Sequence, residues 1–384
     1  MFKYQILNEF IDIHKDLPEQ GTDAWKQLRR SFIGGSEVAS ILKQNKNKST
    51  NKLVLEKLGF DRFKGNVITH WGNVFEELIR LHCEDEFNCT IKETGSIPYK
   101  HGSLSYSPDG VSVIPTKRIV SKFNNAEEFI DVKSASQLVL FEFKCPHSRL
   151  PTFEIPEHYF PQVSIGMNII DIMETAIFVQ GTFRRCLFEQ IEYSTKHNPY
   201  GHFKQADVRS NPIECGFMLV YGNDKDVDYI DSLKEQMVEV GGANLVEHSD
   251  ISVVDIGSLF DQSLLEEVMG HCVSKTFKID YSFRYPYDQS IFKKDAYSKG
   301  MYNQSLQYKS LRCLSLVSKK YKNIIGIIPY KLLNVFMTQV KKNKHYIQET
   351  KAHDKAQTVL QCIDELRDED DMSKVKKLIR AYKL

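Results

Sequence analysis

Residues 138–144 read LVLFEFK, an apolar run interrupted by one acidic and one basic residue. In an extended strand alternate side chains share a face, so Glu142 and Lys144 point to one side and the two phenylalanines to the other. A carboxylate and an ammonium on a buried strand are unfavourable unless they have partners. The stretch therefore predicts a core strand that presents one charged pair to a specific environment.

Residues 107–110 read SPDG and predict a turn that presents Asp109. If the turn lies beside the strand, Asp109, Glu142 and the backbone carbonyl of Phe143 supply the oxygen ligands that Mg²⁺ prefers. Lys144 would then face the attacking water and the scissile phosphate and offset negative charge in the transition state. The simpler interpretation is an ordinary turn near an ion pair on a half-exposed strand, and so short a pattern taken alone favours it.

The chain has 384 residues, of which 41% are apolar and 26% charged, as in a folded protein of one large domain or two ordinary ones. No apolar run approaches the roughly 20 residues that a membrane span needs. The first residues lack the features of a secretory signal, so we expect a protein of the cytosol or nucleus. The eight cysteines form no Cys-x-x-Cys pair, which argues against a zinc ribbon and a disulfide framework.

The net charge of +1 gives no overall attraction to nucleic acid, so any such role rests on local clusters. Residues 26–64 and 312–344 are strongly basic, although most runs of this kind are simply solvated surface. A break at residues 198–201, NPYG, suggests a core over 1–200 and an extension over 201–384. We expect the extension to be mostly helical after about residue 328.

An Asp-containing turn followed by a Glu-x-Lys strand resembles the PD-(D/E)XK nuclease superfamily. The order of further blocks resembles one branch of it, the lambda-exonuclease-like, YqaJ-type viral recombinase family. These blocks are GTDAW at 21–25, IGGSE at 33–37, WGNVFE at 71–76 and IPEHYFPQV at 155–163. The resemblance covers a little under half of the chain, roughly residues 20 to 180.

The resemblance implies an α/β fold, namely a restriction-endonuclease-like core in which helices flank a central mixed sheet. The C-terminal half, which the resemblance does not cover, is expected to form an α+β extension. It assigns Glu76, Asp109 and Glu142 to a metal centre, Glu76 acting directly or through a water. It further assigns Lys144 to catalysis and Gln162 to orienting the site. The implied cofactor is Mg²⁺, with Mn²⁺ as an alternative ion.

The same resemblance assigns Arg29 and Ser36 to the 5′-phosphate of a DNA end, with Trp25 and Gly35 beside them. A guanidinium can bind phosphate through two parallel hydrogen bonds. Ser36 stands at the expected start of a helix over 36–44, where backbone N–H groups favour an anion. The simpler interpretations are an N-cap serine and a tryptophan that packs between helices.

The implied function is a Mg²⁺-dependent deoxyribonuclease that degrades double-stranded DNA from its ends, 5′ to 3′, in viral recombination, repair or replication. One alternative is a structure-specific or restriction-type endonuclease of the same superfamily. Another is a non-catalytic scaffold that binds DNA ends. The expected partners are duplex DNA ends, a single-strand annealing protein and further copies of the chain, and no membrane.

Overall fold

The computed structural model describes most of the chain, and the helices and strands below lie in these parts. The described ranges are 5–61, 65–123, 136–185, 213–223, 227–240, 244–248, 251–256, 262–273, 277–282, 284–286 and 323–382. The expected domain boundary near residue 200 and the basic residues of 312–322 lie outside them. The division into 1–200 and 201–384 therefore stays a prediction.

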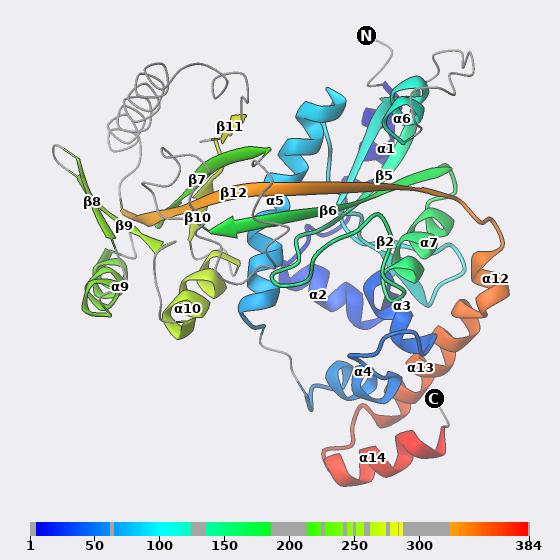
Figure 1. Cartoon of the computed structure of the whole chain (residues 1–384). Helices are drawn as coiled ribbons and strands as arrows, with labels where there is room; N and C mark the ends of the chain where they lie inside the picture. The colour runs from blue at the N-terminus through cyan, green and yellow to red at the C-terminus, as the bar shows by residue number, and fades with distance from the viewer. Residues whose placement is uncertain are drawn as a thin grey trace.

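A long mixed sheet runs through the molecule (Figure 1). Neighbouring strands follow the order β10, β7, β12, β6, β5, β4. β5 and β6 are parallel, whereas β4 with β5, β6 with β12, and β12 with β7 are antiparallel. The expected central mixed sheet is confirmed. Its main strands are β4 (Gly110–Pro115), β5 (Ser136–Lys144), β6 (Thr175–Arg185), β7 (Glu214–Tyr221), β10 (Lys278–Asp280) and β12 (Ile324–Lys341).

Shorter strands extend this sheet and form a second, small one. In the main sheet, β11 pairs with β7, and β9 pairs with both β8 and β12. In the small sheet, β3 lies between β1 and β2. The bounds are β1 (Ile33–Gly34), β2 (Ile97–Pro98), β3 (Leu104–Tyr106), β8 (Asn244–His248), β9 (Ile251–Asp255) and β11 (Arg284–Pro286).

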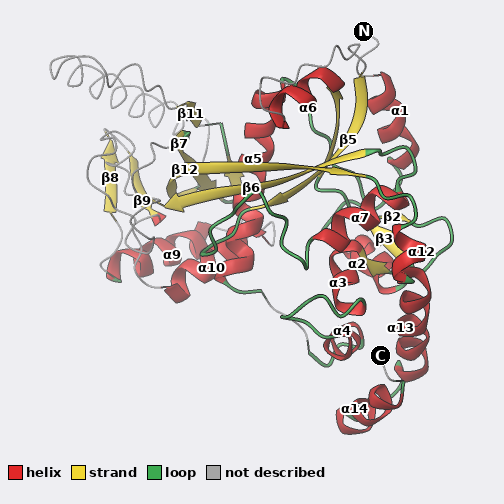
Figure 2. Ribbon diagram, turned by 45° about the vertical axis from the view of Figure 1, so that its right-hand side comes forward, coloured by secondary structure: helices red, strands yellow, loops and turns green. Residues whose placement is uncertain are grey.

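Helices cover both faces of the main sheet (Figure 2). One core forms with α5 (Val67–Phe87), α6 (Thr116–Phe123), α9 (Val227–Glu239) and α10 (Gln262–Val273). The other core forms with α1 (Gln5–His14), α3 (Gly35–Ile41), α4 (Thr50–Lys57), α7 (Phe160–Ile169), α12 (Tyr346–Thr350), α13 (Ala352–Leu366) and α14 (Met372–Ala381). Helix α2 (Asp23–Arg30) buries no residue fully.

Strand β5 shows why the sheet needs helices on both sides. Phe141 and Phe143 belong to the core on the α5 face, whereas Leu138 and Leu140 belong to the core on the α7 face. The expected alternation is therefore present, but both faces are buried. Glu142, on the α7 face, is completely buried and must find its partners inside the protein.

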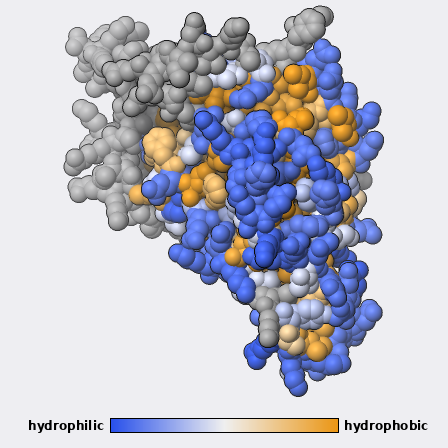
Figure 3. Space-filling view, turned by 90° about the vertical axis from the view of Figure 1, so that its right-hand side faces the viewer, coloured by the Kyte–Doolittle hydropathy of each residue, from blue (hydrophilic) through white to orange (hydrophobic). Residues whose placement is uncertain are grey.

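The expectation of helix after about residue 328 holds only for part of that region. Residues 324–341 form β12, because one end pairs with β7 and the other with β6. Such a strand is buried on both faces over much of its length, so its sequence shows no clear period of two. The helices that follow β12 begin at Tyr346. Figure 3 shows that the side of the molecule that carries α12 and α13 has a largely hydrophilic surface.

No helix in the described ranges combines the length and the hydrophobicity required to cross a bilayer. The helix expected over 36–44 begins at Gly35 and ends at Ile41 instead, with Gly34 as its N-cap.

Candidate active site

The ammonium of Lys144 lies among the oxygen atoms that the sequence assigns to a metal ion. Its Nζ atom is 3.5 Å from Oδ2 of Asp109, 2.9 Å from the carbonyl oxygen of Phe143, and in contact with Oε1 of Glu142. The turn that carries Asp109 is fixed to the end of β5, because the backbone N–H of Phe143 donates to Oδ2 of Asp109 at 2.8 Å. The turn and the strand therefore meet as expected.

The buried carboxylate of Glu142 is held by three elements. The Tyr106 hydroxyl at the end of β3 donates to its Oε2 at 2.6 Å. The Gln162 side-chain amide in α7 and the Lys144 ammonium both contact its Oε1. Gln162, expected to orient the site, thus contacts the Glu142 carboxylate, and both oxygens of that carboxylate have a partner.

Glu76 approaches the same cluster from α5. Burial raises the pKa of its carboxyl well above the ordinary value, and the nearby Asp109 raises it further. Burial likewise raises the pKa of Glu142 to about 7, with Asp109 adding to the shift and Lys144 opposing it. Burial lowers the pKa of Lys144, but the surrounding carboxylates outweigh it and the net direction is upward. Crowding of these carboxyls thus favours their protonated forms, because full ionisation would place more negative charge here than one ammonium offsets.

In the described part of the chain, no three His, Cys, Asp or Glu side chains already surround one point as a metal site does. Instead of surrounding a common point, Asp109 and Glu142 both contact the Lys144 ammonium. The donor chemistry nevertheless fits a hard divalent cation, because the available groups are carboxylate and carbonyl oxygens. When ionised, the carboxylates of Glu76, Asp109 and Glu142 leave two negative charges that Lys144 does not balance.

Arg29 lies at the end of α2 in a second, smaller cluster. Its guanidinium lies 4.9 Å from the centre of the Trp25 ring, and its Nη2 is 3.4 Å from Oε2 of Glu37. Trp25 also donates through Nε1 to the hydroxyl of Ser107, at 3.3 Å, beside the turn that carries Asp109. The tryptophan therefore connects Arg29 to the neighbourhood of the Lys144 cluster.

Glu37 is the acid that holds this second cluster together. Its Oε2 accepts from the backbone N–H of Gly34 at 2.8 Å and is 3.1 Å from Nζ of Lys57. Burial raises the pKa of Glu37, but Lys57 and Arg29 lower it by more, so it is ionised near neutral pH. Lys57 also donates to the carbonyls of Arg29 and Phe32, at 3.1 and 2.9 Å.

The two glycines before Ser36 lie close against the side chains of Arg29 and Tyr106. A Cβ atom at Gly34 would overlap Nη2 of Arg29, and one at Gly35 would lie 2.5 Å from the Tyr106 ring. Ser36 is exposed in the first turn of α3. It is not the N-cap, which was the simpler interpretation, since Gly34 takes that position.

Sequence reasoning did not single out Tyr106, Glu37 or Lys57. The signals for the first two were present, because Tyr106 stands three residues before Asp109 and Glu37 ends the block at 33–37. Lys57 gave no signal, since its role depends on the packing of α4 against α2 and α3. Glu93 is a further acid whose pKa is raised, first by burial and then by Glu77.

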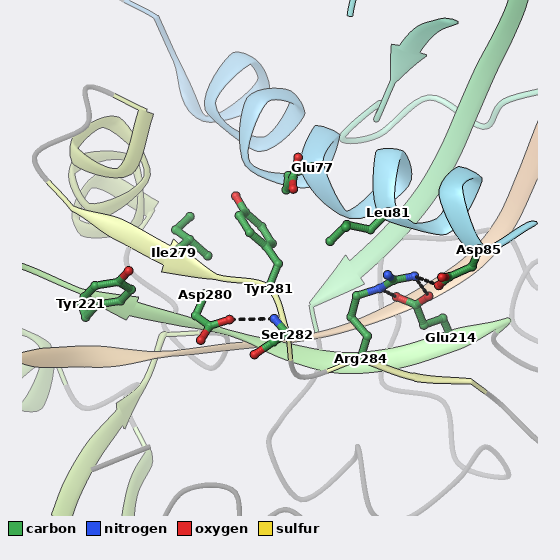
Figure 4. Close-up of a pocket in the computed structure, with 10 residues that line it drawn as sticks. All are labelled: Glu77, Leu81, Asp85, Glu214, Tyr221, Ile279, Asp280, Tyr281, Ser282 and Arg284. Carbon is green, nitrogen blue, oxygen red and sulfur yellow. Dashed lines mark hydrogen bonds and ion pairs between the residues drawn. The ribbon is translucent and has the colours of Figure 1, made fainter. Parts of the chain in front are cut away.

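A separate pocket of about 670 Å³ lies between α5 and the strands β7, β10 and β11 (Figure 4). Within it Arg284 donates to both carboxylate oxygens of Glu214, at 2.9 and 2.6 Å, and lies 3.1 Å from Oδ2 of Asp85. The hydroxyl of Tyr281 donates to the carbonyl of Val74 on α5 at 3.0 Å. None of the site residues expected from the sequence lines this pocket.

Comparisons with known proteins agree with the sequence blocks. Residues 24–172 match the YqaJ-like viral recombinase domain. A protein of African swine fever virus, strain Badajoz 1971 Vero-adapted, is 28% identical over 226 residues, which cover 56% of this chain and 64% of the relative. Its counterpart in the isolate Tick/South Africa/Pretoriuskop Pr4/1996 is 28% identical over 204 residues, covering 50% and 58%. The match thus spans less than two thirds of these relatives.

Two solved structures with 18% sequence identity were also found, each aligned over 41% of this chain and 73% of the other. One is the alkaline exonuclease LHK-Exo from Laribacter hongkongensis, with a TM-score of 0.30, and the other is LHK-Exo in complex with dAMP, with a TM-score of 0.32. The family match includes the Asp109 turn and strand β5. The resemblance seen in the sequence blocks is thus confirmed as a match of residues 24–172 to the model of the YqaJ-like viral recombinase domain family.

Proposed function

We propose that the chain is a metal-dependent deoxyribonuclease with a PD-(D/E)XK core, which degrades double-stranded DNA from its ends. The observation that carries the proposal is the cluster in which Lys144 contacts Asp109, Glu142 and the carbonyl of Phe143. The cluster brings together the two kinds of group that a metal-dependent phosphodiester hydrolase uses, carboxylates that would bind a divalent cation and an ammonium that would face the reacting phosphate.

In this proposal Asp109, Glu142 and the Phe143 carbonyl would hold Mg²⁺ or Mn²⁺, and Glu76 would be a further ligand, directly or through a water. The bound metal would polarise the phosphate and lower the pKa of an attacking water. Lys144 then turns from the carboxylates toward the phosphate and offsets its developing charge. Two of the carboxylates are held ready, Glu142 by Tyr106 and Gln162, and Asp109 by the N–H of Phe143.

We propose further that Arg29 and Ser36 bind the 5′-phosphate of a DNA end, with Trp25 and Gly35 shaping the site, so that degradation proceeds 5′ to 3′. Support comes from the position of Arg29, which packs on Gly34 at the start of α3, two residues from Ser36. Its guanidinium uses one face for Trp25 and one N–H edge for Glu37. The remaining donors of its fork are suited to a phosphate.

One assay tests the proposal against its alternatives. Linear and covalently closed duplex DNA are incubated with the full chain, with Mg²⁺ or with EDTA. We expect the chain to degrade linear duplex in Mg²⁺, and to degrade neither linear duplex in EDTA nor closed circles in either condition. Degradation should be faster when the 5′ end carries a phosphate. Cutting of closed circles would instead identify an endonuclease, and binding without cutting would identify a scaffold. A single-strand annealing protein and further copies of the chain stay predicted partners.

A further inference from the structure

A row of three residues crosses the sheet away from the Lys144 cluster. Lys144 on β5 pairs in register with Gln180 on β6, and Gln180 pairs in register with Phe336 on β12. Residues directly opposite on neighbouring strands project to the same face. With strands about 4.8 Å apart, Phe336 stands roughly 10 Å from Lys144 on the face that α7 covers.

The loop from β5 to α7 is fixed beside this row by a single buried amide. Gln180 is fully buried, and its Oε1 accepts from Nη2 of Arg149 at 2.6 Å. Its Nε2 donates to the carbonyls of Thr152 and Glu154, at 2.7 and 3.4 Å. The side-chain amide of Gln180 thus holds residues 149–154 next to the end of β5 through these hydrogen bonds.

The same loop presents an aromatic ring to solvent. Phe153 is 67% exposed, although its carbonyl accepts a 2.6 Å hydrogen bond from Thr338 on β12. Its ring meets Phe336 in a T-shaped contact, with centroids 5.0 Å apart. Isolated exposed apolar residues are common. Here, however, the backbone on both sides of the ring is anchored to two strands of the sheet.

Arg149 adds a positive charge to the same loop. It forms no ion pair with a carboxylate among the residues that the structure describes, and its hydrogen bond to Gln180 uses one N–H of the guanidinium. The remaining donors can therefore bind an anion. An aromatic face beside a cation is the combination with which proteins bind single-stranded nucleic acid, the base on the ring and the phosphate on the cation.

We infer that Phe153 and Arg149 form a binding site for an unpaired nucleotide of the DNA strand that occupies the Lys144 cluster. This inference rests on the proposed nuclease function. Phe336, whose ring centroid is 5.0 Å from that of Phe153, stands roughly 10 Å from Lys144, a separation that corresponds to about three nucleotides at about 3.4 Å per nucleotide. The base stacks on Phe153, Phe336 supports that ring from the side, and Arg149 binds a neighbouring phosphate.

The test uses the full chain in EDTA and a single-stranded oligodeoxynucleotide that carries 2-aminopurine, whose fluorescence falls when it stacks. We expect Phe153→Leu to weaken binding about 5- to 140-fold and to abolish the quenching, as for one lost stacked base. Phe153→Trp should retain both. Phe160→Leu, at another exposed phenylalanine, is the matched control and should behave as the unchanged chain.

A second measurement addresses the charge. Arg149→Gln should lower the slope of log affinity against log salt concentration by about one. Unchanged affinity and quenching in Phe153→Leu, or no binding of the oligonucleotide by the unchanged chain, would overturn the inference. Cleavage of linear duplex is assayed in parallel with Asp109→Asn. If Asp109→Asn still cleaves the duplex, the proposed nuclease site is wrong. If Phe153→Leu binds the oligonucleotide normally, only the proposed stacking site is wrong.

Discussion

The Nζ atom of Lys144 lies 2.9 Å from the backbone carbonyl oxygen of Phe143, the residue that precedes it. To make this contact the side chain must fold back over its own strand toward Asp109 and Glu142. A lysine in this position serves as the counter-ion of the carboxylates. If a divalent cation takes over that role, the ammonium becomes available to a substrate phosphate.

Removing either carboxylate of the cluster should abolish cleavage. We expect Asp109→Ala and Glu142→Ala to lower the rate on linear duplex at least about 100-fold, because changes outside the first ligand shell already cost 10- to 100-fold. The rate is measured by gel in Mg²⁺, with circular dichroism to follow folding. A folded variant that degrades the duplex at the normal rate would show that the site is misassigned.

Lys144→Ala should separate turnover from binding. Loss of a charge that stabilises the transition state lowers kcat by about 100- to 1000-fold. Affinity for the DNA end should change little, since the ammonium is occupied by Asp109 and Glu142 before substrate arrives. Single-turnover rates and equilibrium binding are measured on the same duplex. Weak binding with normal turnover would contradict this role for the lysine.

Arg29→Ala should remove the preference for a 5′-phosphorylated end over a 5′-hydroxyl end. The matched control is Arg30→Ala, because Arg30 is the exposed neighbour on the same helix and carries the same charge. Degradation rates on the two end chemistries are compared for each variant. If the preference for a 5′-phosphorylated end persists in Arg29→Ala, or is lost equally in Arg30→Ala, residues other than Arg29 must recognise the phosphate.

Gly34→Ala should reproduce part of the Arg29→Ala result without removing any charge. The added methyl group would overlap Nη2 of Arg29 and displace the guanidinium from its place beside Glu37. Gly72→Ala is the control, since a Cβ atom there meets no atom within 4 Å and its helical position tolerates alanine. We expect the preference for a 5′-phosphorylated end to fall in Gly34→Ala and to stay unchanged in Gly72→Ala. Equal preference in both variants would show that Gly34 does not help to position Arg29.

Glu214→Gln should destabilise the chain in a pH-dependent way. Burial raises the pKa of Glu214, but the nearby His82, whose Nδ1 is 3.8 Å from Oε2, and the hydrogen-bonded Arg284 lower it by more, to about 2 against an ordinary value of 4.5. Stabilisation by the ionised form is therefore complete above pH 4.5 and is lost as the pH falls toward 2. At pH 7 it amounts to about 3 kcal/mol.

Urea unfolding at pH 7 and at several lower values measures this difference. The free energy of unfolding of Glu214→Gln should approach that of the unchanged chain as the medium becomes more acid. Glu235→Gln, at an exposed glutamate on α9, serves as the control and should show no such convergence. A gap of constant size across the pH range would mean that Glu214 stabilises the fold by shape rather than by charge.

The sequence predicts the local parts of the site well. The alternation in residues 138–144 predicts that Glu142 and Lys144 share a face, and the SPDG sequence predicts a turn that presents Asp109 and could lie beside them. These features depend on a few neighbouring residues and on strand geometry. The family blocks then predict that Gln162 and Glu76 join the cluster, which neither period nor spacing can indicate.

Features that depend on distant pairing could not be predicted from the sequence. Residues 324–341 form a strand because β6 and β7 flank them, while their nearly continuous apolar pattern suits a buried helix equally well. Glu37 and Lys57 likewise reveal their roles only when three helices meet. The Lys144 contacts follow from rotamer choice, which depends on the charges that surround the side chain.

Strand β12 has a consequence for how the chain is synthesised. Until the ribosome has added residues 324–341, the eleven residues of β6 have a free edge lined by buried-type side chains. Such an edge invites pairing with another nascent chain. This edge of β6 can therefore be covered only after residue 341 has been synthesised, and fragments cut after residue 185 should aggregate.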